Sequence, residues 1–329
     1  MKYAVNMKYF CVLLLSFTVS IHADIAPVDF DISMGKGTKH YDACLKAKTG
    51  PYTLATKPKP AIELFNLFRQ LYEKNNVSKV ACHEKVKIPH VMHSVWIGGQ
   101  FPSKFQKYRD SWIEKHPTWA HIFWTDNPIN YDQGLMVEHI DTLVDDLHNG
   151  VYAGKLMVIN VSKLKLFNQK LYDRVSNLGE KSDILKYELV YKFGGVYIDC
   201  DFECIQPIDI LHRCYDFYVG IQPLDESLAL GAALFGATVG HRILKECIET
   251  MERDQKHTVI THRTGPIHFT RAFFTQAAIE QNDINIAWPA SFFYPVAFYQ
   301  KNISTQSKKE LIRPETFAIH HWAGTWVGK

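Results

Sequence analysis

Residues 182–203, SDILKYELVYKFGGVYIDCDFE, constrain the fold of this chain more than any other segment, because a helical pattern runs into a strand-like one through two glycines. Apolar residues recur at helical spacing up to Phe193, and Ser182 is the expected N-terminal cap of that helix. Gly194 is its expected C-terminal stop. The apolar run that follows predicts a short buried strand. Acidic side chains therefore lie where a strand leaves its sheet.

The order of the neighbouring elements predicts an α/β fold. Residues 88–99 have the pattern of a buried strand that ends at two glycines. A helical segment then stops at Pro117, and residues 120–126 form a second short strand. Strand, helix and strand in this order begin an α/β sheet. Later segments alternate in a similar way, so we expect one α/β domain over residues 88–329.

The first 87 residues lack the alternating strand and helix patterns of the rest of the chain. Residues 1–23 combine two lysines, a twelve-residue apolar run and a small residue at Ala23, which is the pattern of a secretory signal peptide. The run is shorter than the roughly 20 residues of a membrane helix. We therefore expect export from the cytosol to the periplasm, the medium or a secretory lumen, with no stable membrane span once the leader is removed; an uncleaved anchor is the alternative. Residues 24–87 have the pattern of an N-terminal appendage, irregular at first and then helical.

Charge and cysteine content narrow the classes of partner. The chain has 37 Lys and Arg against 34 Asp and Glu, a formal net charge of +3 that falls further when the two lysines of the leader are lost. Such a small charge predicts no nucleic-acid binding. Six cysteines follow the leader, which permits disulfides in an exported protein but does not fix their partners.

The acidic strand end has the pattern of a metal site. Asp199 and Asp201 are two residues apart, so on an extended backbone their side chains point to the same side, opposite Cys200. Carboxylates held this close repel each other unless a cation lies between them. Oxygen ligands suit Mn²⁺ or Mg²⁺, and sites for Mg²⁺ usually add substrate phosphates to one or two carboxylates. The spacing therefore predicts a phosphate-bearing ligand; the alternative is a polar strand end that simply opens a loop.

The preceding helix brings further side chains toward this point. Asp183, Lys186 and Tyr187 stand at i, i+3 and i+4, on one helix face. The double glycine permits a turn tight enough for this face and the strand end to flank one cavity. We expect all three side chains to face the ligand.

These residues carry a family resemblance. Residues 182–209 resemble the sugar-binding region with DXD motif of retaining glycosyltransferases of family 32, which includes initiating mannosyltransferases of the yeast-type Golgi, related galactosyltransferases and, more distantly, glucosylating toxins. IPHVMHSVWIGGQFP is similar to the family's opening strand, and TGPIHFT, FFYPV and AIHHWAGTW to later landmarks, so the resemblance covers roughly residues 88–326. It implies a GT-A-type, Rossmann-like nucleotide-sugar-binding domain with a mixed central sheet and helical insertions. We identify no counterpart of the first 87 residues.

The resemblance implies a role for each matching residue around the donor. Asp201 would bind the metal directly, while Asp199 would contact ribose or sugar and support the metal through water. Asp183 would accept hydrogen bonds from donor sugar hydroxyls. Trp96 would stack on the nucleotide base; a core position in its strand is the alternative. Lys186 stands where the family usually has arginine, so a contact with diphosphate or sugar is expected without the bidentate geometry of a guanidinium.

The resemblance also assigns residues near the C-terminus. His320 would be a metal or diphosphate ligand, and His321 is the weaker candidate; a structural histidine is the alternative for each. Thr325 and Trp326 would contact the donor diphosphate or the leaving oxygen. Pro266 is expected to start a helix, and the turn before it would border the acceptor or sugar pocket or serve structure alone.

These observations predict a retaining, metal-dependent glycosyltransferase that moves a hexosyl or N-acetylhexosaminyl unit from a nucleotide diphosphate sugar to a hydroxyl of a glycan, lipid or protein. Retention follows from the resemblance alone. If the acceptor attacks from the leaving-group face, the departing phosphate takes its proton and no carboxylate base is required. A sugar-binding homologue without turnover is one alternative, favoured by the lysine at position 186. A haloacid-dehalogenase-type phosphatase is the other, disfavoured because Glu203 stands where that class has Thr or Val.

Overall fold

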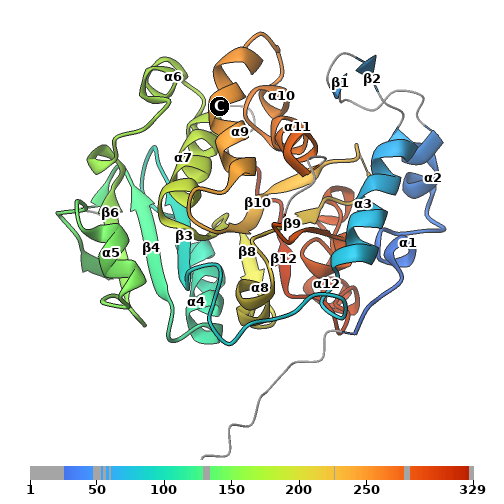
Figure 1. Ribbon diagram of the computed structural model, residues 1–329, viewed down its shortest axis with the longest axis horizontal. Helices are drawn as coiled ribbons and strands as arrows, with labels where there is room; N and C mark the ends of the chain where they lie inside the picture. The colour runs from blue at the N-terminus through green and yellow to red at the C-terminus, as the bar shows by residue number, and fades with distance from the viewer. Residues whose placement is uncertain are drawn as a thin grey trace, which may run out of the picture.

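A mixed eight-stranded sheet forms the centre of the computed structural model, which describes residues 26–46, 53–54, 57–58, 61–128, 134–225, 227–277 and 282–325 (Figure 1). The strand order is β11-β9-β10-β7-β3-β4-β6-β5. The strands of this sheet are β3 (Val91–Trp96), β4 (Ala120–Thr125), β5 (Leu135–Met136), β6 (Leu156–Asn160), β7 (Gly195–Ile198), β9 (Phe217–Ile221), β10 (Leu230–Ala237) and β11 (Asn285–Trp288). The predicted signal peptide lies outside the described residues.

Strand directions make the sheet mixed. β10 runs antiparallel to its neighbours β7 and β9, whereas the other adjacent pairs are parallel. The predicted α/β fold with a mixed central sheet is thereby confirmed. Two further pairs are antiparallel: β1 (Thr53–Leu54) with β2 (Lys57–Pro58), and β8 (Phe202–Cys204) with β12 (Ala318–His320).

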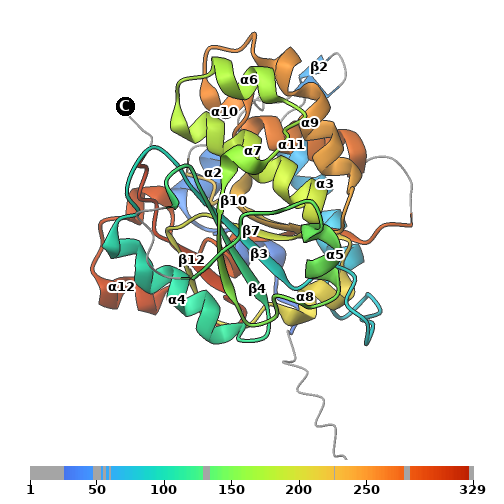
Figure 2. The ribbon, with the colours of Figure 1, turned by 90° about the vertical axis from the view of Figure 1, so that its left-hand side faces the viewer.

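Helices cover both faces of the sheet. The α7, α9 and α11 helices lie on one face, and α4 and α8 lie on the other, in both views (Figures 1 and 2). The bounds of these five are α4 (Gln106–Lys115), α7 (Leu178–Phe193), α8 (Asp209–Cys214), α9 (Arg242–Asp254) and α11 (Pro266–Ala277). The shorter helices are α5 (Leu143–His148), α6 (Gln169–Arg174), α10 (Ile260–Arg263) and α12 (Thr305–Glu310), with 3-10 turns η1 (Ser103–Phe105), η3 (Val161–Lys163), η4 (Ala290–Phe292) and η5 (Phe298–Gln300). No helix within the described ranges is long and apolar enough to cross a bilayer.

The junction of α7 and β7 shows how the sequence positions the acidic strand end. A side chain at Gly195, which has φ 94°, would place its Cβ 2.2 Å from the Val91 carbonyl oxygen, so only glycine lets β7 start this close to β3. The predicted cap, Ser182, was wrong: the N-cap of α7 is Asn177, and its side chain accepts from the backbone N–H groups of residues 179 and 180. Asn and Ser are both favoured N-cap residues, and the hydrogen bonds to Asn177 fix the start of the helix.

The N-terminal segment packs against the same core. Its helices are α1 (Phe30–Ser33), α2 (Lys39–Lys46) and α3 (Ala61–Asn75). Phe68 of α3 packs on Phe274 of α11 with ring centroids 4.6 Å apart, and the Asn75 side chain donates to the backbone of β11. A disulfide between Cys82 and Cys214 then ties the end of this segment to α8. The segment that the sequence describes as an appendage is therefore held to α11 by a ring contact, to β11 by a hydrogen bond and to α8 by a covalent bond.

Candidate active site

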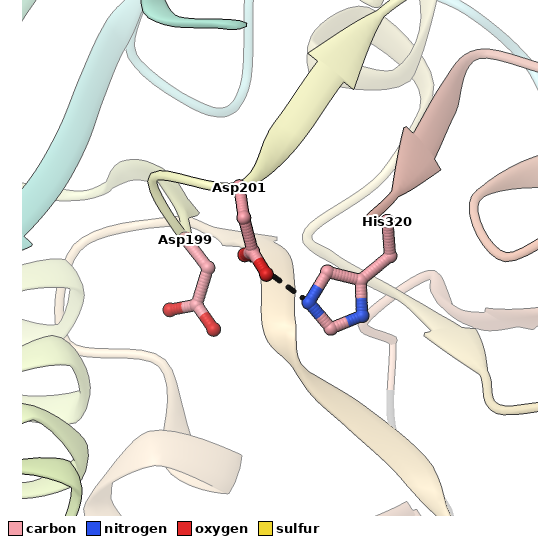
Figure 3. A group of neighbouring side chains, drawn as sticks. All are labelled: Asp199, Asp201 and His320. Carbon is pink, nitrogen blue, oxygen red and sulfur yellow. Dashed lines mark ion pairs between the residues drawn. The ribbon is translucent and has the colours of Figure 1, made fainter. Parts of the chain in front are cut away.

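Three potential metal ligands meet where β7 ends and where β8 and β12 pair. Asp199 follows β7, Asp201 precedes β8, and His320 ends β12, which is hydrogen-bonded to β8 (Figure 3). One ligand atom from each side chain lies within 4.8 Å of those of the other two. Asp201 Oδ1 and His320 Nε2 are 3.2 Å apart. Two aspartates separated by one residue and a histidine near the C-terminus are thus brought together by strand pairing.

Asp201 is held in place from two sides. Its Oδ2 accepts a 2.7 Å hydrogen bond from the Ala323 backbone N–H, and its carbonyl oxygen accepts from the His321 N–H. Burial raises the pKa of Asp201, but the imidazole of His320 and the Ala323 N–H outweigh that effect and lower the pKa to about 2. Asp201 is therefore ionised at neutral pH.

Asp199 has the opposite tendency. Burial raises the pKa of its carboxyl, attraction to Lys186 lowers it, and repulsion from Asp201 raises it again; the result is a pKa of about 6. The Tyr197 hydroxyl donates a 2.7 Å hydrogen bond to Asp199 Oδ1. The carboxyl of Asp199 therefore binds a proton more readily than an ordinary aspartate does, and a bound cation would lower its pKa and displace that proton.

The donor atoms fit a divalent cation. Two carboxylates and one imidazole offer both oxygen and nitrogen, a set that suits Mn²⁺ better than Mg²⁺, which prefers oxygen and keeps several waters. His320 Nδ1 is buried and has no hydrogen-bond partner in the described part of the chain. The other ring nitrogen, Nε2, faces Asp201 Oδ1 and is the atom in position to bind a metal.

The three side chains line a cavity of about 440 Å³. Asp183 and Lys186 of α7 form another part of the wall, with Trp96 of β3 and Thr325 of the C-terminal segment further along it. The turn before α11 contributes Gly265 and Pro266, and α11 begins at Pro266 as predicted. Trp326 lies outside the described residues.

A buried ion pair on α7 lies beside the strand end. Lys186 Nζ lies 2.5 Å from Asp183 Oδ1, and Asp183 Oδ2 accepts a hydrogen bond from the Thr264 hydroxyl. The same ammonium group is 5.5 Å from the centre of the Tyr197 ring and lowers the pKa of Asp199. A positive charge therefore stands between the helix face and the two aspartates.

Two predicted contacts are not found. Tyr187 is fully buried and does not line the cavity; its hydroxyl donates to the Thr264 carbonyl oxygen, because this position of α7 faces the α11 layer. His321 lies outside the metal cluster, since its Nε2 is 2.8 Å from Glu203 Oε2 and its ring stacks on Tyr108. Trp96 is half-buried and lies against the cavity, with its indole N–H donating to the Gln100 carbonyl oxygen.

Sequence reasoning missed several side chains of the site. Tyr197 was detectable, because it stands two residues before Asp199 and so points to the same side of the strand. Gln222, Asp225 and Phe298 also line the cavity, but they come from the loop after β9 and from η5. No local pattern in the sequence marks these three.

The comparison with protein families agrees with this geometry. Residues 102–218 match the family model described as glycosyltransferase sugar-binding region containing DXD motif. The resemblance predicted from the sequence is therefore confirmed.

The alignments with similar named proteins each cover only part of those proteins. Inositol phosphoceramide mannosyltransferase 1 of Schizosaccharomyces pombe is 25% identical over 198 residues, 58% of this chain and 52% of that protein. Subversion of eukaryotic traffic protein A of Legionella pneumophila is 22% identical over 172 residues, 52% of this chain and 26% of that protein. Lactosylceramide 4-alpha-galactosyltransferase of Mus musculus is 26% identical over 152 residues, 43% of this chain and 40% of that protein. The chain thus spans about half or less of the length of these relatives.

Solved structures with a similar arrangement include the PaToxG glycosyltransferase, with a TM-score of 0.47, 16% identity and coverage of 66% of this chain and 79% of that one. The UDP-bound glycosyltransferase domain from the YGT toxin has a TM-score of 0.43 and 12% identity, and the alignment covers 62% of this chain and 80% of that one.

Proposed function

We propose that this chain is a metal-dependent, retaining glycosyltransferase that moves a hexosyl or N-acetylhexosaminyl unit from a nucleotide diphosphate sugar to a hydroxyl. The observation that carries the proposal is the convergence of Asp199, Asp201 and His320 inside a cavity whose wall also presents Asp183 and Lys186. The family match over residues 102–218 and the named transferase activities of the relatives support it.

Different residues of the cavity would bind the metal, the diphosphate, the sugar and the base of the donor. Asp201, ionised at neutral pH, and His320 would bind the cation, with Asp199 beside them. A bound Mn²⁺ ion would supply positive charge for the oxygens of the departing diphosphate. Lys186 would add a second positive charge in the same cavity, and Asp183, which is paired with it, would accept a hydrogen bond from a sugar hydroxyl. Trp96 offers a half-buried ring to the nucleotide base.

The proposed stereochemistry needs no side-chain base. When the acceptor hydroxyl approaches on the face from which the diphosphate departs, a diphosphate oxygen is within reach of the acceptor proton. The role of the chain is then to orient both substrates and to exclude water, and we assign no base to it.

Export from the cytosol is part of the proposal. It rests on the signal-peptide pattern of residues 1–23 and is supported by the disulfide between Cys82 and Cys214, because disulfides persist in oxidising compartments.

A panel of UDP- and GDP-sugars tests the proposed function. Hydrolysis of the donor is measured without acceptor, with Mn²⁺ and after chelation, for the wild-type protein and for Asp201→Asn. We expect one donor to be hydrolysed only with metal, and the rate to fall at least 100-fold in the variant, since a carboxamide does not replace a carboxylate ligand. Glu203→Gln is the matched control, because this carboxylate is a neighbour in sequence that binds His321 instead. Turnover that survives chelation or the Asp201 substitution contradicts the proposal.

A further inference from the structure

The cavity continues beyond the metal cluster along an aromatic wall. The ring of Trp322 lies 4.1 Å from that of His320, and the ring of Phe298 lies 5.8 Å from Trp322 at 87°. The backbone N–H of Phe298 donates a 2.8 Å hydrogen bond to Asp225 Oδ2. Together with Gln222, these side chains line the same cavity as the cluster. The cavity wall therefore runs from His320 through Trp322 and Phe298 to the carboxylate of Asp225.

The wall is held firmly. Trp322 has φ 54° and is the one non-glycine with a positive φ in the described part of the chain, a conformation that costs energy for a bulky residue. Its indole N–H donates to the Val296 carbonyl oxygen, which fixes the ring. Phe298 keeps 37% of its surface exposed at the mouth, with Lys301 Nζ 3.9 Å from its ring centre. Trp322 is thus positioned in advance, and Phe298, with Lys301 over its ring, keeps part of its surface exposed to a ligand.

The polar groups beside the rings have unused hydrogen-bonding capacity. Among the described residues, the Phe298 N–H is bound to Oδ2 of Asp225 and no donor is bound to Oδ1, which can accept a further hydrogen bond. The side-chain amide of Gln222 has no protein partner among the described residues, although it is half-buried, and it offers two donors and an acceptor. Both groups line the cavity and are only half-buried, so they can exchange bound water for the hydroxyls of a ligand.

We propose that this wall, formed by Gln222, Asp225, Phe298 and Trp322, binds the pyranose ring of a glycoside acceptor; the inference rests on the proposed function. A pyranose has apolar C–H faces that pack on aromatic rings and a rim of hydroxyls that need donors and acceptors. An acyl chain would leave Asp225 and Gln222 without partners, at a cost in binding free energy. The arrangement of two rings with two polar groups matches a sugar.

The position of the wall orients the acceptor for transfer. A ring packed on Trp322 brings one hydroxyl next to His320 and the two aspartates, where the donor sugar would lie. The oxygen of that hydroxyl forms the new bond to the anomeric carbon, and the bond from that carbon to the diphosphate oxygen breaks. The bonding electron pair leaves on the diphosphate, which takes the hydroxyl proton.

The test uses the donor found in the nucleotide-sugar panel, Mn²⁺, and the methyl glycosides of mannose, glucose and galactose at up to 50 mM. Product analysis gives the ratio of transfer to hydrolysis for the wild-type protein, Asp225→Asn and Phe298→Ala. Saturation-transfer NMR gives the affinity of each protein for the accepted glycoside. Tyr299→Ala is the matched aromatic control, because this exposed ring stacks on His40 and does not line the cavity.

We expect transfer to at least one methyl glycoside, with a ratio at least tenfold lower in Asp225→Asn and in Phe298→Ala and a change of less than twofold in Tyr299→Ala. If Phe298→Ala does not fold, Asp225→Asn alone decides, since it preserves shape. Donor hydrolysis without transfer to any of the three glycosides overturns the inference and leaves the proposed function standing. An unchanged ratio in Asp225→Asn does the same. Absence of any donor turnover overturns both.

Discussion

The hydroxyl of Tyr197 controls how readily Asp199 ionises, and Tyr197→Phe removes it with little change in shape. This hydroxyl donates a 2.7 Å hydrogen bond to the carboxylate, whose pKa is already raised to about 6 by burial. A hydrogen bond to a charged group contributes about 1.5–3 kcal/mol. At 1.36 kcal/mol per pKa unit, its loss should move the pKa of Asp199 in the metal-free variant to about 7–8.

A higher pKa of Asp199 should weaken the binding of Mn²⁺ at neutral pH. A cation must displace the proton of Asp199, so a higher pKa weakens binding at neutral pH. At pH 7 the wild-type carboxyl is about nine-tenths ionised, and the variant is between about one-half and one-tenth ionised. The Kd for Mn²⁺ should therefore rise about two- to tenfold at pH 7 and approach the wild-type value by about pH 8.5.

Electron paramagnetic resonance of free Mn²⁺ measures this Kd at several pH values between 6 and 8.5. Tyr215→Phe is the matched control, because its buried hydroxyl donates to the Asn75 carbonyl oxygen, away from the cluster. A Tyr197→Phe protein whose Kd equals that of wild type at pH 7, or differs from it by the same factor at every pH, refutes the reasoning.

Three further predictions concern stability, measured by urea unfolding. Asp199→Asn should stabilise the metal-free protein at pH 7 by about 3 kcal/mol, because a pKa raised from 3.8 to about 6 gives stability that is present below pH 3.8 and lost as the pH rises through 6; the gain should shrink to less than about 1 kcal/mol at pH 4. Arg263→Met should cost about 3 kcal/mol by leaving Glu180, 3% exposed, without its two-point partner, and adding Glu180→Gln should restore part of the loss. Cys82→Ser together with Cys214→Ser should cost about 2–5 kcal/mol, and a reductant should then lower the stability of wild type only.

The features predictable from the sequence are those that a few adjacent residues encode. The glycine pair fixes the turn from α7 to β7 because a Cβ at Gly195 has no room. Asp199 and Asp201 do converge, but the predicted extended backbone that turns Cys200 away was wrong. A turn closed by the Phe202 N–H and the Asp199 carbonyl oxygen brings the two aspartates together, and Cys200 lines the same cavity. The boundary of α7 was misplaced because Asn177 and Ser182 both suit a cap. Only the contacts at the Asn177 side chain decide between them.

Features that depend on distant segments could not be read from local patterns. His320 reaches the aspartates through the pairing of β12 with β8, and only the family resemblance pointed to it. Tyr187 shares a helix face with Asp183 by spacing, but the packing of α11 against that face buries its ring. Asp225 and Phe298 meet through a loop and a 3-10 turn that carry no periodic pattern.

A crystal structure with Mn²⁺ and a nucleoside diphosphate, UDP or GDP, tests the central claim most directly, because anomalous scattering locates the metal without assumptions. The account predicts one strong anomalous peak among Asp199, Asp201 and His320, with diphosphate oxygens completing its ligands and Lys186 close to them. A peak elsewhere, or a nucleotide bound outside the cavity that these residues line, contradicts it.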